Sequence, residues 1–190
     1  ALRDVTDTVQ SLPLIASSIM SKKIAAGAHQ IVLDVKVGSG GFMKTQAEGE
    51  KLASLMVQIG KLANRKVIAY LTSMEQPLGN YVGNGLEVYE AIQLLTEKDL
   101  SSDLAQVTLA LAGEMIFLAG KANSPSAGTK LASEAWQSGL ALNKMEKWIS
   151  LQKGDPSVVR SPEKLLGETQ QKEILAAQCG YINSFLVEEL

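Results

Sequence analysis

Apolar residues recur at two different spacings in the first part of the chain, and this change of spacing predicts alternating helices and strands. Residues 14–26 are mostly apolar, follow Pro13 and precede Gly27. Proline suits the first turn of a helix and glycine suits its left-handed end, so this run is predicted to be helical. Residues 30–37 are rich in β-branched residues and stop at a run of glycines, which predicts a buried strand.

A second helix and a second strand are predicted directly after the glycine run. Thr45 is suited to cap a helix over residues 46–64. Within that range apolar residues recur at helical spacing, at Leu52, Leu55, Met56, Ile59 and Leu62. Residues 66–72 repeat the strand pattern. A strand, a helix and a strand of these lengths predict a right-handed crossover between two parallel strands.

The remainder of the chain is predicted to be mainly helical. A glycine-containing loop covers residues 73–84, and a linker-like loop covers residues 153–162. Four helices are expected between these loops, over residues 85–96, 101–121, 126–141 and 143–152. Residues 163–190 have no clear pattern, although residues 180–182 favour the opening of a strand.

Composition and charge narrow the class of protein. Hydrophobic residues make up 46% of the chain and charged residues 20%, as in a soluble globular protein. The net charge of -2 comes without a basic block, so nucleic-acid binding is not expected. The apolar runs are too short to cross a membrane, and the start of the chain is not typical of a signal peptide. We therefore expect a cytoplasmic protein.

Residues that often bind metals or react as nucleophiles are rare in this chain. Cys179 is the single cysteine, so an internal disulfide and a multi-cysteine metal site are excluded. His29 is the single histidine and has no cysteine or acid at ligand spacing, which argues against a metal site around it. The sequence starts with Ala1 rather than with Met, so we expect it to be an internal part of a longer polypeptide.

One polar pair stands out on the first predicted helix. Ser18 and Lys22 lie four residues apart, so they share a face of a run that is otherwise mostly apolar. Arg3 lies just upstream and is able to fold back beside them. A guanidinium, a hydroxyl and an ammonium suit a flat ligand with carbonyl oxygens and an imide N–H. From spacing alone, however, such a pair is more often a solvated stripe on a helix.

Features near the other predicted elements leave alternatives open. The glycine turn at residues 38–41 lies between a strand and a helix, a setting that can hold phosphate on backbone N–H groups. It matches neither the Walker pattern nor the dinucleotide fingerprint, so a tight structural turn is favoured. Asp34 and Lys36 point the same way on the preceding strand, where they either face a cleft or pair with each other. Glu87 and Glu90 are expected on the surface of their helix.

Several segments, in the correct order, resemble the thymidine and pyrimidine-nucleoside phosphorylase family. They lie at residues 1–6 (ALRDVT), 12–23 (LPLIASSIMSKK), 32–40 (VLDVKVGSG), 76–79 (QPLG), 83–84 (GN), 86–88 (LEV) and 90–91 (EA). The matching stretches are spread over residues 1–155. Several motifs in order are far more specific than any one of them alone, so the resemblance outweighs the argument from spacing.

The resemblance implies an enzyme, a glycosyltransferase of the pentosyltransferase type that serves pyrimidine salvage. In the family, the Arg of the ALRD motif and the Ser and Lys of the SSIxSK motif hold the pyrimidine base. These positions are Arg3, Ser18 and Lys22. The implied reaction is reversible phosphorolysis of uridine- or thymidine-type nucleosides, in which orthophosphate yields the free base and a pentose 1-phosphate. Arg3 and Lys22 would be catalytic, because they stabilise the negative charge that grows on the departing base.

The resemblance also implies that the protein binds a monovalent cation, such as K⁺, and that it uses no organic cofactor. The carbonyls of Leu78 and Tyr81 and the side chain of Glu90 would hold it, together with ligands that lie further upstream in the family. The family's phosphate-binding loop, KHSTGG, also lies upstream and is absent from this chain. The phosphate-binding residues of this chain are therefore unknown.

The fold implied by the resemblance is α/β, with a mixed sheet flanked by helices, plus a helical segment from a small all-α lobe. Residues 1–26 would belong to the helical lobe, carry the base-binding residues and dock a partner subunit, which implies a homodimer. Residues 27–155 would belong to the α/β lobe. Residues 156–190 would form a linker and the beginning of a C-terminal domain. Gly27 would then be the hinge between the two lobes.

The chain departs from the family pattern, and other functions stay open. Ser73 and Glu75 replace the Asp and Asn of the family loop DMNQPLG. We expect this chain alone to be incomplete as an enzyme. A non-catalytic truncated paralogue or a dimerisation module is one alternative. A related phosphoribosyltransferase is less favoured, because no acidic pair for a diphosphate-and-magnesium site follows a predicted strand.

Overall fold

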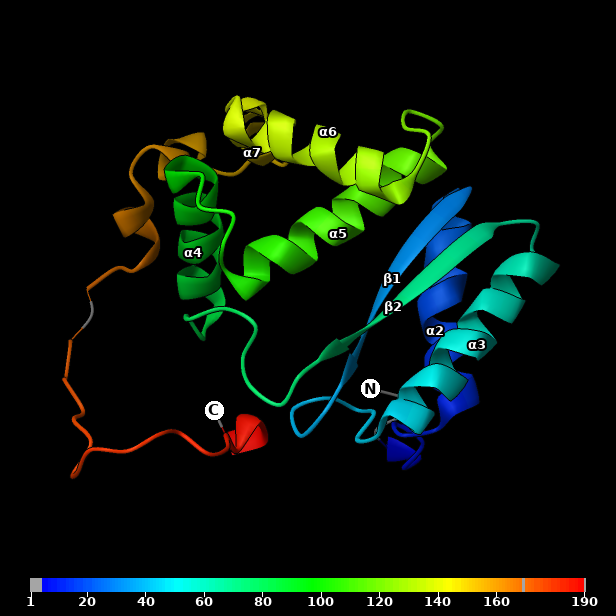
Figure 1. The fold of residues 1–190 in the computed structure, drawn as a ribbon, viewed down its shortest axis with the longest axis horizontal. Helices are drawn as coiled ribbons and strands as arrows, with labels where there is room; N and C mark the ends of the chain where they lie inside the picture. The colour runs from blue at the N-terminus through cyan, green and yellow to red at the C-terminus, as the bar shows by residue number, and fades with distance from the viewer. Residues whose placement is uncertain (1–4, 169, 190) are drawn as a thin grey trace.

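The computed structural model describes residues 5–168 and 170–189, which form an α/β fold (Figure 1). Its helices and strands follow one another in the order expected from the sequence. They are α2 (Leu12–Ala25), β1 (Gln30–Val37), α3 (Gln46–Leu62), β2 (Lys66–Ser73), α4 (Asn84–Glu97), α5 (Asp103–Leu118), α6 (Pro125–Gln137) and α7 (Leu140–Leu151). Three short 3-10 helices follow at Pro156–Val159, Pro162–Leu165 and Val187–Glu189. The predicted α/β class is confirmed.

The sheet of the described residues consists of β1 and β2, which run parallel as predicted. Gln30 pairs with Lys66 at one end, and Val37 pairs with Ser73 at the other, in one continuous register. Because β2 is the described neighbour of β1, the second edge of β1 is open in this part of the chain.

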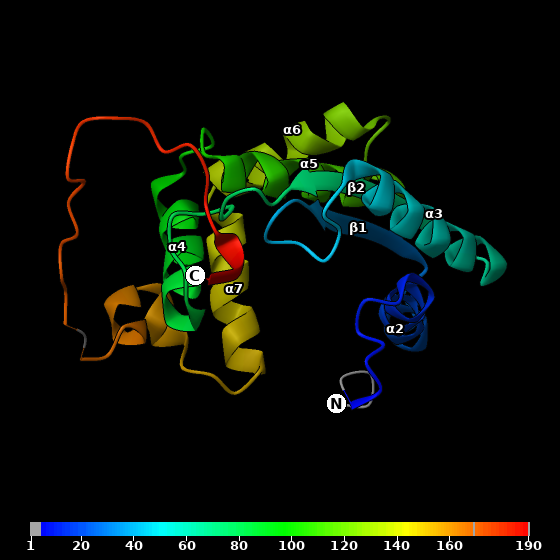
Figure 2. The ribbon, with the colours of Figure 1, turned by 90° about the horizontal axis from the view of Figure 1, so that it is seen from below.

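The two faces of the sheet are covered by different helices. Figure 2 shows α2 on one side of the strands and α5 and α6 on the other. Side chains alternate along a strand, so β1 turns an apolar row toward α2 and α3 and a row containing Asp34 and Lys36 the other way. Tyr70, which pairs with Asp34 across the sheet, donates a hydrogen bond from its hydroxyl to Glu114 of α5 at 2.6 Å. The polar row therefore lies on the α5 side.

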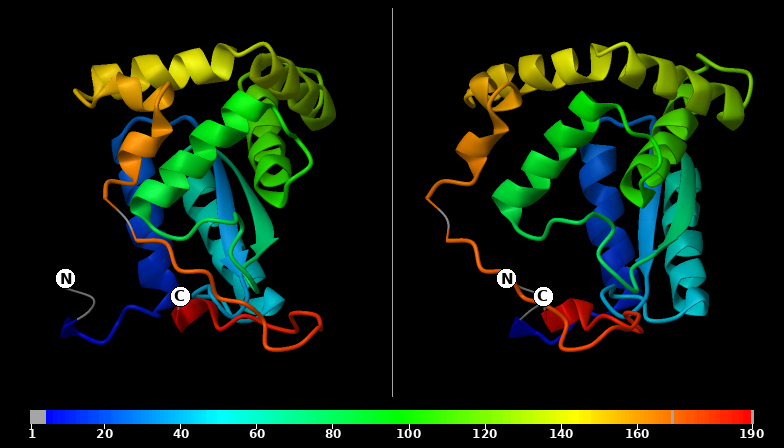
Figure 3. Two further views of the ribbon diagram at one scale, coloured as in Figure 1. Left: turned by 90° about the vertical axis from the view of Figure 1, so that its left-hand side faces the viewer. Right: turned by 60° about the vertical axis from the view of Figure 1, so that its left-hand side comes forward.

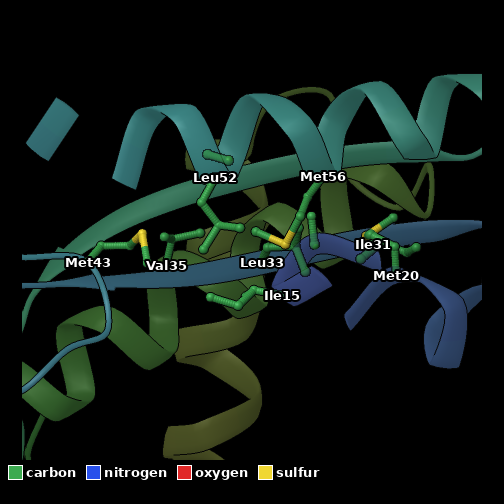
Figure 4. Close-up of a cluster of buried hydrophobic side chains, with 10 residues drawn as sticks. Ile15, Met20, Ile31, Leu33, Val35, Met43, Leu52 and Met56 are labelled. Atoms are coloured by element: carbon green, nitrogen blue, oxygen red, sulfur yellow. The ribbon is translucent and has the colours of Figure 1, made fainter. Parts of the chain in front are cut away.

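The main core lies between α2, β1 and α3 (Figure 4). Its buried side chains are Ile15, Ala16, Met20, Ile31, Leu33, Val35, Met43, Leu52, Ala53 and Met56. Gly60 lets α3 approach β2 closely, because a Cβ there would lie 2.1 Å from Cγ2 of Val67. Helix α2 and strand β1 share this core, although the predicted division assigns them to different lobes. The division of the chain into lobes at residues 1–26 and 27–155 stays a prediction.

The helix ends follow their sequence signals. Thr45 caps α3, because its hydroxyl accepts from the Glu48 N–H at 3.3 Å while the Glu48 carboxylate accepts from the Thr45 N–H at 3.1 Å. Gly27 has a φ of 80° just after α2. Helix α5 is shorter than predicted, because Ser102 caps its start and Gly120 adopts a φ of 70° beyond its end. Among the described helices, none is long and apolar enough to cross a bilayer.

The last part of the chain differs from the prediction. Residues 170–186 contain neither helix nor strand, so the strand favoured at residues 180–182 does not form. A strand needs a hydrogen-bonded neighbour, and the described sheet provides none there. Figure 3 shows this extended segment returning toward the loops at the end of the strands, where Glu188 forms an ion pair with Lys44.

Candidate functional site

Two loops meet at the carboxyl end of the sheet, where ligands bind in open α/β folds. The glycine turn follows β1, and the loop that begins at Met74 follows β2. Met74 joins them, because its N–H donates to the Val37 carbonyl at 2.7 Å and its carbonyl accepts from the Gly40 N–H at 3.0 Å. Cavities open around this junction, and Met74 lines two of them.

All four backbone N–H groups of the glycine turn already have acceptors within the protein. The Gly38 N–H donates to the Met43 carbonyl at 2.9 Å, and the Gly41 N–H donates to the Gly38 carbonyl at 3.0 Å. The Ser39 N–H donates to the Glu75 carboxylate at 3.2 Å. The Gly40 N–H donates to the Met74 carbonyl in the loop after β2. This geometry favours the tight structural turn over phosphate binding.

Ser18 and Lys22 lie on one flank of α2, as their spacing predicts. Ser18 is half-buried and Lys22 is exposed. The next flank of the same helix contributes Ile15, Ile19 and Lys23 to a cavity of about 540 Å³, here named the β1 cavity. With 3.6 residues per turn, the Ser18–Lys22 flank adjoins this wall of the cavity. The volume falls within the range of small-molecule sites.

The Ser18 hydroxyl and the Lys22 ammonium have no hydrogen-bond partner among the described residues, so both groups can meet a ligand. Arg3, the third predicted base-binding residue, lies outside the described residues. The proximity of Arg3 to the other two therefore stays a prediction.

Asp34 and Lys36 pair with each other and also line the β1 cavity, so both alternatives left open by the sequence hold. The Lys36 Nζ lies 2.7 Å from the Asp34 Oδ2. It also donates to the Thr72 Oγ1 at 2.9 Å, and the Thr72 hydroxyl donates to the Asp34 Oδ1. The side chain of Asp34 is 23% exposed and that of Lys36 is 28% exposed. Asp34 as a whole residue is more exposed, because its backbone lies on the open edge of β1.

The residues expected to hold a cation lie in one place. Leu78, Tyr81 and Glu90 line a cavity of about 460 Å³, here named the α4 cavity. Glu90 is 7% exposed, and its Oε1 accepts from the Asn80 N–H at 2.7 Å. A Cβ at Gly79 would lie 2.1 Å from the Glu90 Oε2, so only glycine lets the loop pass this carboxylate.

The expectation that Glu90 lies on the surface of its helix is wrong, whereas Glu87 is exposed as expected. The loop after β2 folds over α4 and covers Glu90, and the pattern of the helix alone does not contain this contact. The described residues hold no group of three or more His, Cys, Asp or Glu side chains arranged around a metal. A cation in the α4 cavity would depend on one carboxylate and backbone carbonyls, an all-oxygen set of the kind that suits K⁺.

Sequence reasoning missed a second buried carboxylate, Glu114 of α5. It is 4% exposed and accepts a hydrogen bond from the Tyr70 hydroxyl at 2.6 Å. This hydrogen bond, followed by burial and the negative charge of Glu114, raises the pKa of Tyr70 to about 12. The sequence does contain a signal for this residue. Asp34, Tyr70 and Thr72 form a polar row on one face of the sheet, and such a row favours a polar side chain on the helix that covers it.

Comparison with known protein families agrees with this arrangement of helices, strands and loops. The family described as "Glycosyl transferase family, a/b domain" matches residues 1–142. The chain belongs to this glycosyl transferase family. The glycosyl transferase a/b domain thus includes β1, β2 and the loops that form both cavities.

Curated relatives narrow the resemblance further. A pyrimidine-nucleoside phosphorylase of Staphylococcus epidermidis is 50% identical to this glycosyl transferase chain over all 190 residues. The proteins of the same name from Staphylococcus haemolyticus and Staphylococcus aureus are 48% and 47% identical over the same length. The chain spans 44% of the length of each relative. The resemblance read from the sequence motifs is confirmed.

Proposed function

We propose that the polypeptide containing this chain is a pyrimidine-nucleoside phosphorylase. The observation that carries the proposal is the identity of 47–50% over the whole chain to three proteins of that name. The proposed reaction transfers the pentose of uridine- or thymidine-type nucleosides to orthophosphate, which releases the free base and a pentose 1-phosphate. The chain would supply the base-binding part of the active site.

Arg3, Ser18 and Lys22 would hold the pyrimidine. As phosphate attacks the anomeric carbon, the base departs with the bonding electrons, and negative charge grows on its ring and carbonyl oxygens. The Lys22 ammonium and the Arg3 guanidinium would stabilise this charge most in the transition state. Ser18 would orient the ring by a hydrogen bond. The unpartnered hydroxyl of Ser18 and ammonium of Lys22, side by side on α2, support this assignment.

The test is a phosphorolysis assay on the complete natural polypeptide that contains residues 1–190. Uridine and thymidine are incubated with and without orthophosphate, and free base is separated by chromatography. We expect release of uracil and thymine only when phosphate is present. Absence of phosphate-dependent release from both nucleosides would refute the proposed function.

We further propose that a monovalent cation, K⁺, is held in the α4 cavity by the carbonyls of Leu78 and Tyr81 and by the Glu90 carboxylate. The buried carboxylate and the glycine that makes room for it support this assignment. The cation would supply a fixed positive charge that draws the loop after β2 onto α4. K⁺ should raise the melting temperature more than Li⁺ at equal ionic strength, and equal effects of both ions would exclude a selective site.

We also propose that the protein is a cytoplasmic homodimer that docks through the helical segment at residues 1–26. Leu14 of α2, which is exposed on the outer side of the helix, supports a contact there. Sedimentation equilibrium of the complete polypeptide should give a dimer, and Leu14→Glu should shift it toward monomer. An unchanged dimer in that variant would place the interface elsewhere.

A further inference from the structure

The loop after β2 is held against the glycine turn by the side chain of Glu75. The Glu75 Oε2 accepts a hydrogen bond from the Ser39 N–H at 3.2 Å. The Glu75 N–H donates to the Ser73 hydroxyl at 3.3 Å, a local turn that helps to fix the backbone from which the carboxylate extends. Ser73 and Glu75 are also the two positions of this loop named above as departures from the family pattern. The contact is therefore made by residues that distinguish this chain.

The turn and the loop approach each other so closely that Gly38 has no room for a side chain. A Cβ at Gly38 would lie 2.9 Å from the Glu75 Oε1 and 2.7 Å from the carbonyl carbon of Met74. The φ of Gly38 is 138°, a conformation that favours glycine. The backbone of Met74 adds two hydrogen bonds to the same contact. The start of the loop is therefore packed tightly on the turn, and the Glu75 carboxylate is the side-chain part of that packing.

The same loop is held by a second carboxylate further along. The buried Glu90 of α4 accepts a hydrogen bond from the Asn80 N–H at 2.7 Å. Leu78 lies between Glu75 and Asn80 in the sequence, and Tyr81 follows Asn80 directly. The backbone that carries the two carbonyls proposed as cation ligands is therefore held on either side of Leu78 and directly before Tyr81. A loop that is fixed before its ligand arrives loses less conformational entropy on binding.

We propose that Glu75 is a positioning residue for the cation-binding loop, because its bond to the Ser39 N–H keeps the Leu78 and Tyr81 carbonyls in place before K⁺ binds. This inference rests on the cation site of the proposed function above. The described lining of the α4 cavity does not include Glu75, so this side chain acts through the backbone of the loop. An ionised acceptor strengthens the bond, whereas solvent at this exposed position weakens it, so a moderate effect on K⁺ binding is expected.

The test measures the K⁺ concentration for half-maximal thermal stabilisation of the complete natural polypeptide at constant ionic strength. In Glu75→Leu, which has no acceptor, we expect this concentration to rise about fivefold. Glu75→Gln keeps the length and an acceptor oxygen, so the rise should stay below about twofold. Ser73→Ala should cause a smaller rise than Glu75→Leu. Glu134→Leu removes an exposed acid on α6 and is the matched control, which should leave the value unchanged.

Hydrogen exchange followed by mass spectrometry gives a second readout that needs neither turnover nor K⁺. One amide in the peptide that covers residues 38–43 should exchange about fivefold faster in Glu75→Leu than in the wild type. Unchanged exchange, or faster exchange with an unchanged K⁺ dependence, would overturn the proposal. If Glu75→Leu does not fold by circular dichroism, the shorter Glu75→Asn decides by the same two measurements.

The outcomes also separate this proposal from the proposed function. Equal stabilisation of the wild type by K⁺ and Li⁺ would refute the cation site and with it the positioning role of Glu75. Phosphorolysis is measured separately by the release of free base. A protein that releases no base but binds K⁺ more weakly in Glu75→Leu would therefore refute the proposed reaction and support the role of Glu75.

Discussion

Replacing Tyr70 by Phe removes one hydroxyl from β2 and tests how α5 is held on the sheet. The hydroxyl donates to the Glu114 carboxylate at 2.6 Å, and Glu114 is 4% exposed. Phenylalanine fills the same space, so the variant loses the hydrogen bond without opening a cavity. The carboxylate then lacks its donor while it stays shielded from water, which costs about 1–3 kcal/mol.

The same hydrogen bond makes this stabilisation depend on pH. The pKa of Tyr70 is raised from 10.0 to about 12, first by the hydrogen bond to Glu114 and then by burial. Because the folded pKa lies above the unfolded one, the stabilisation is complete below about pH 10 and is lost as the pH rises toward about 12. A pKa difference of about two corresponds to about 2.7 kcal/mol. Solvent access to the half-buried phenol reduces this to about 1–2 kcal/mol.

Urea unfolding followed by circular dichroism measures the effect on the wild-type chain and on Tyr70→Phe at pH 8 and pH 11. At pH 8 we expect the variant to be less stable by about 1–2 kcal/mol. At pH 11, midway between the two pKa values, the difference should fall by about half. Tyr181→Phe is the control, because Tyr181 is fully exposed. Equal stability at pH 8, or the same difference at both pH values, would refute this reasoning.

Other predictions concern the proposed base and cation sites and one helix cap. Lys22→Ala should lower kcat/KM for uridine in the complete polypeptide by about a hundredfold or more, while Lys61→Ala, an exposed lysine on α3, should leave it unchanged. Glu90→Gln keeps the Asn80 bond but removes the charge, so the K⁺ concentration for half-maximal thermal stabilisation should rise about tenfold. Thr45→Ala removes the cap of α3 and should lower the free energy of unfolding by about 1 kcal/mol in urea melts.

Local signals were sufficient for most of the helices and strands. The β-branched run at residues 30–37 forms β1 with the predicted bounds, because its alternation matches a strand buried on one face. Thr45 caps α3 as predicted, and Glu48 completes the cap from within the first turn. Such features depend on residues that are close together in the sequence, so the sequence pattern alone predicts them.

Features that depend on distant contacts could not be predicted in this way. Glu90 is buried by a loop that folds back over α4, and the buried Glu114 accepts a hydrogen bond from a tyrosine that lies on β2. The strand period showed that Asp34 and Lys36 share a face, but it did not identify Thr72 as their common partner. The roles of Ser18 and Lys22 came from the family resemblance, because a polar pair on a helix has no specific meaning by itself.

The two cavities are connected by a single residue at the carboxyl end of the sheet. Met74 lines both the β1 cavity and the α4 cavity. Its backbone bonds to Val37 at 2.7 Å and to Gly40 at 3.0 Å, so the loop after β2 cannot shift without moving the glycine turn. The Glu75 carboxylate adds a further bond to this turn. We therefore expect a ligand that tightens the loop over Glu90 to change the wall beside Asp34 as well, because these hydrogen bonds hold the two loops together.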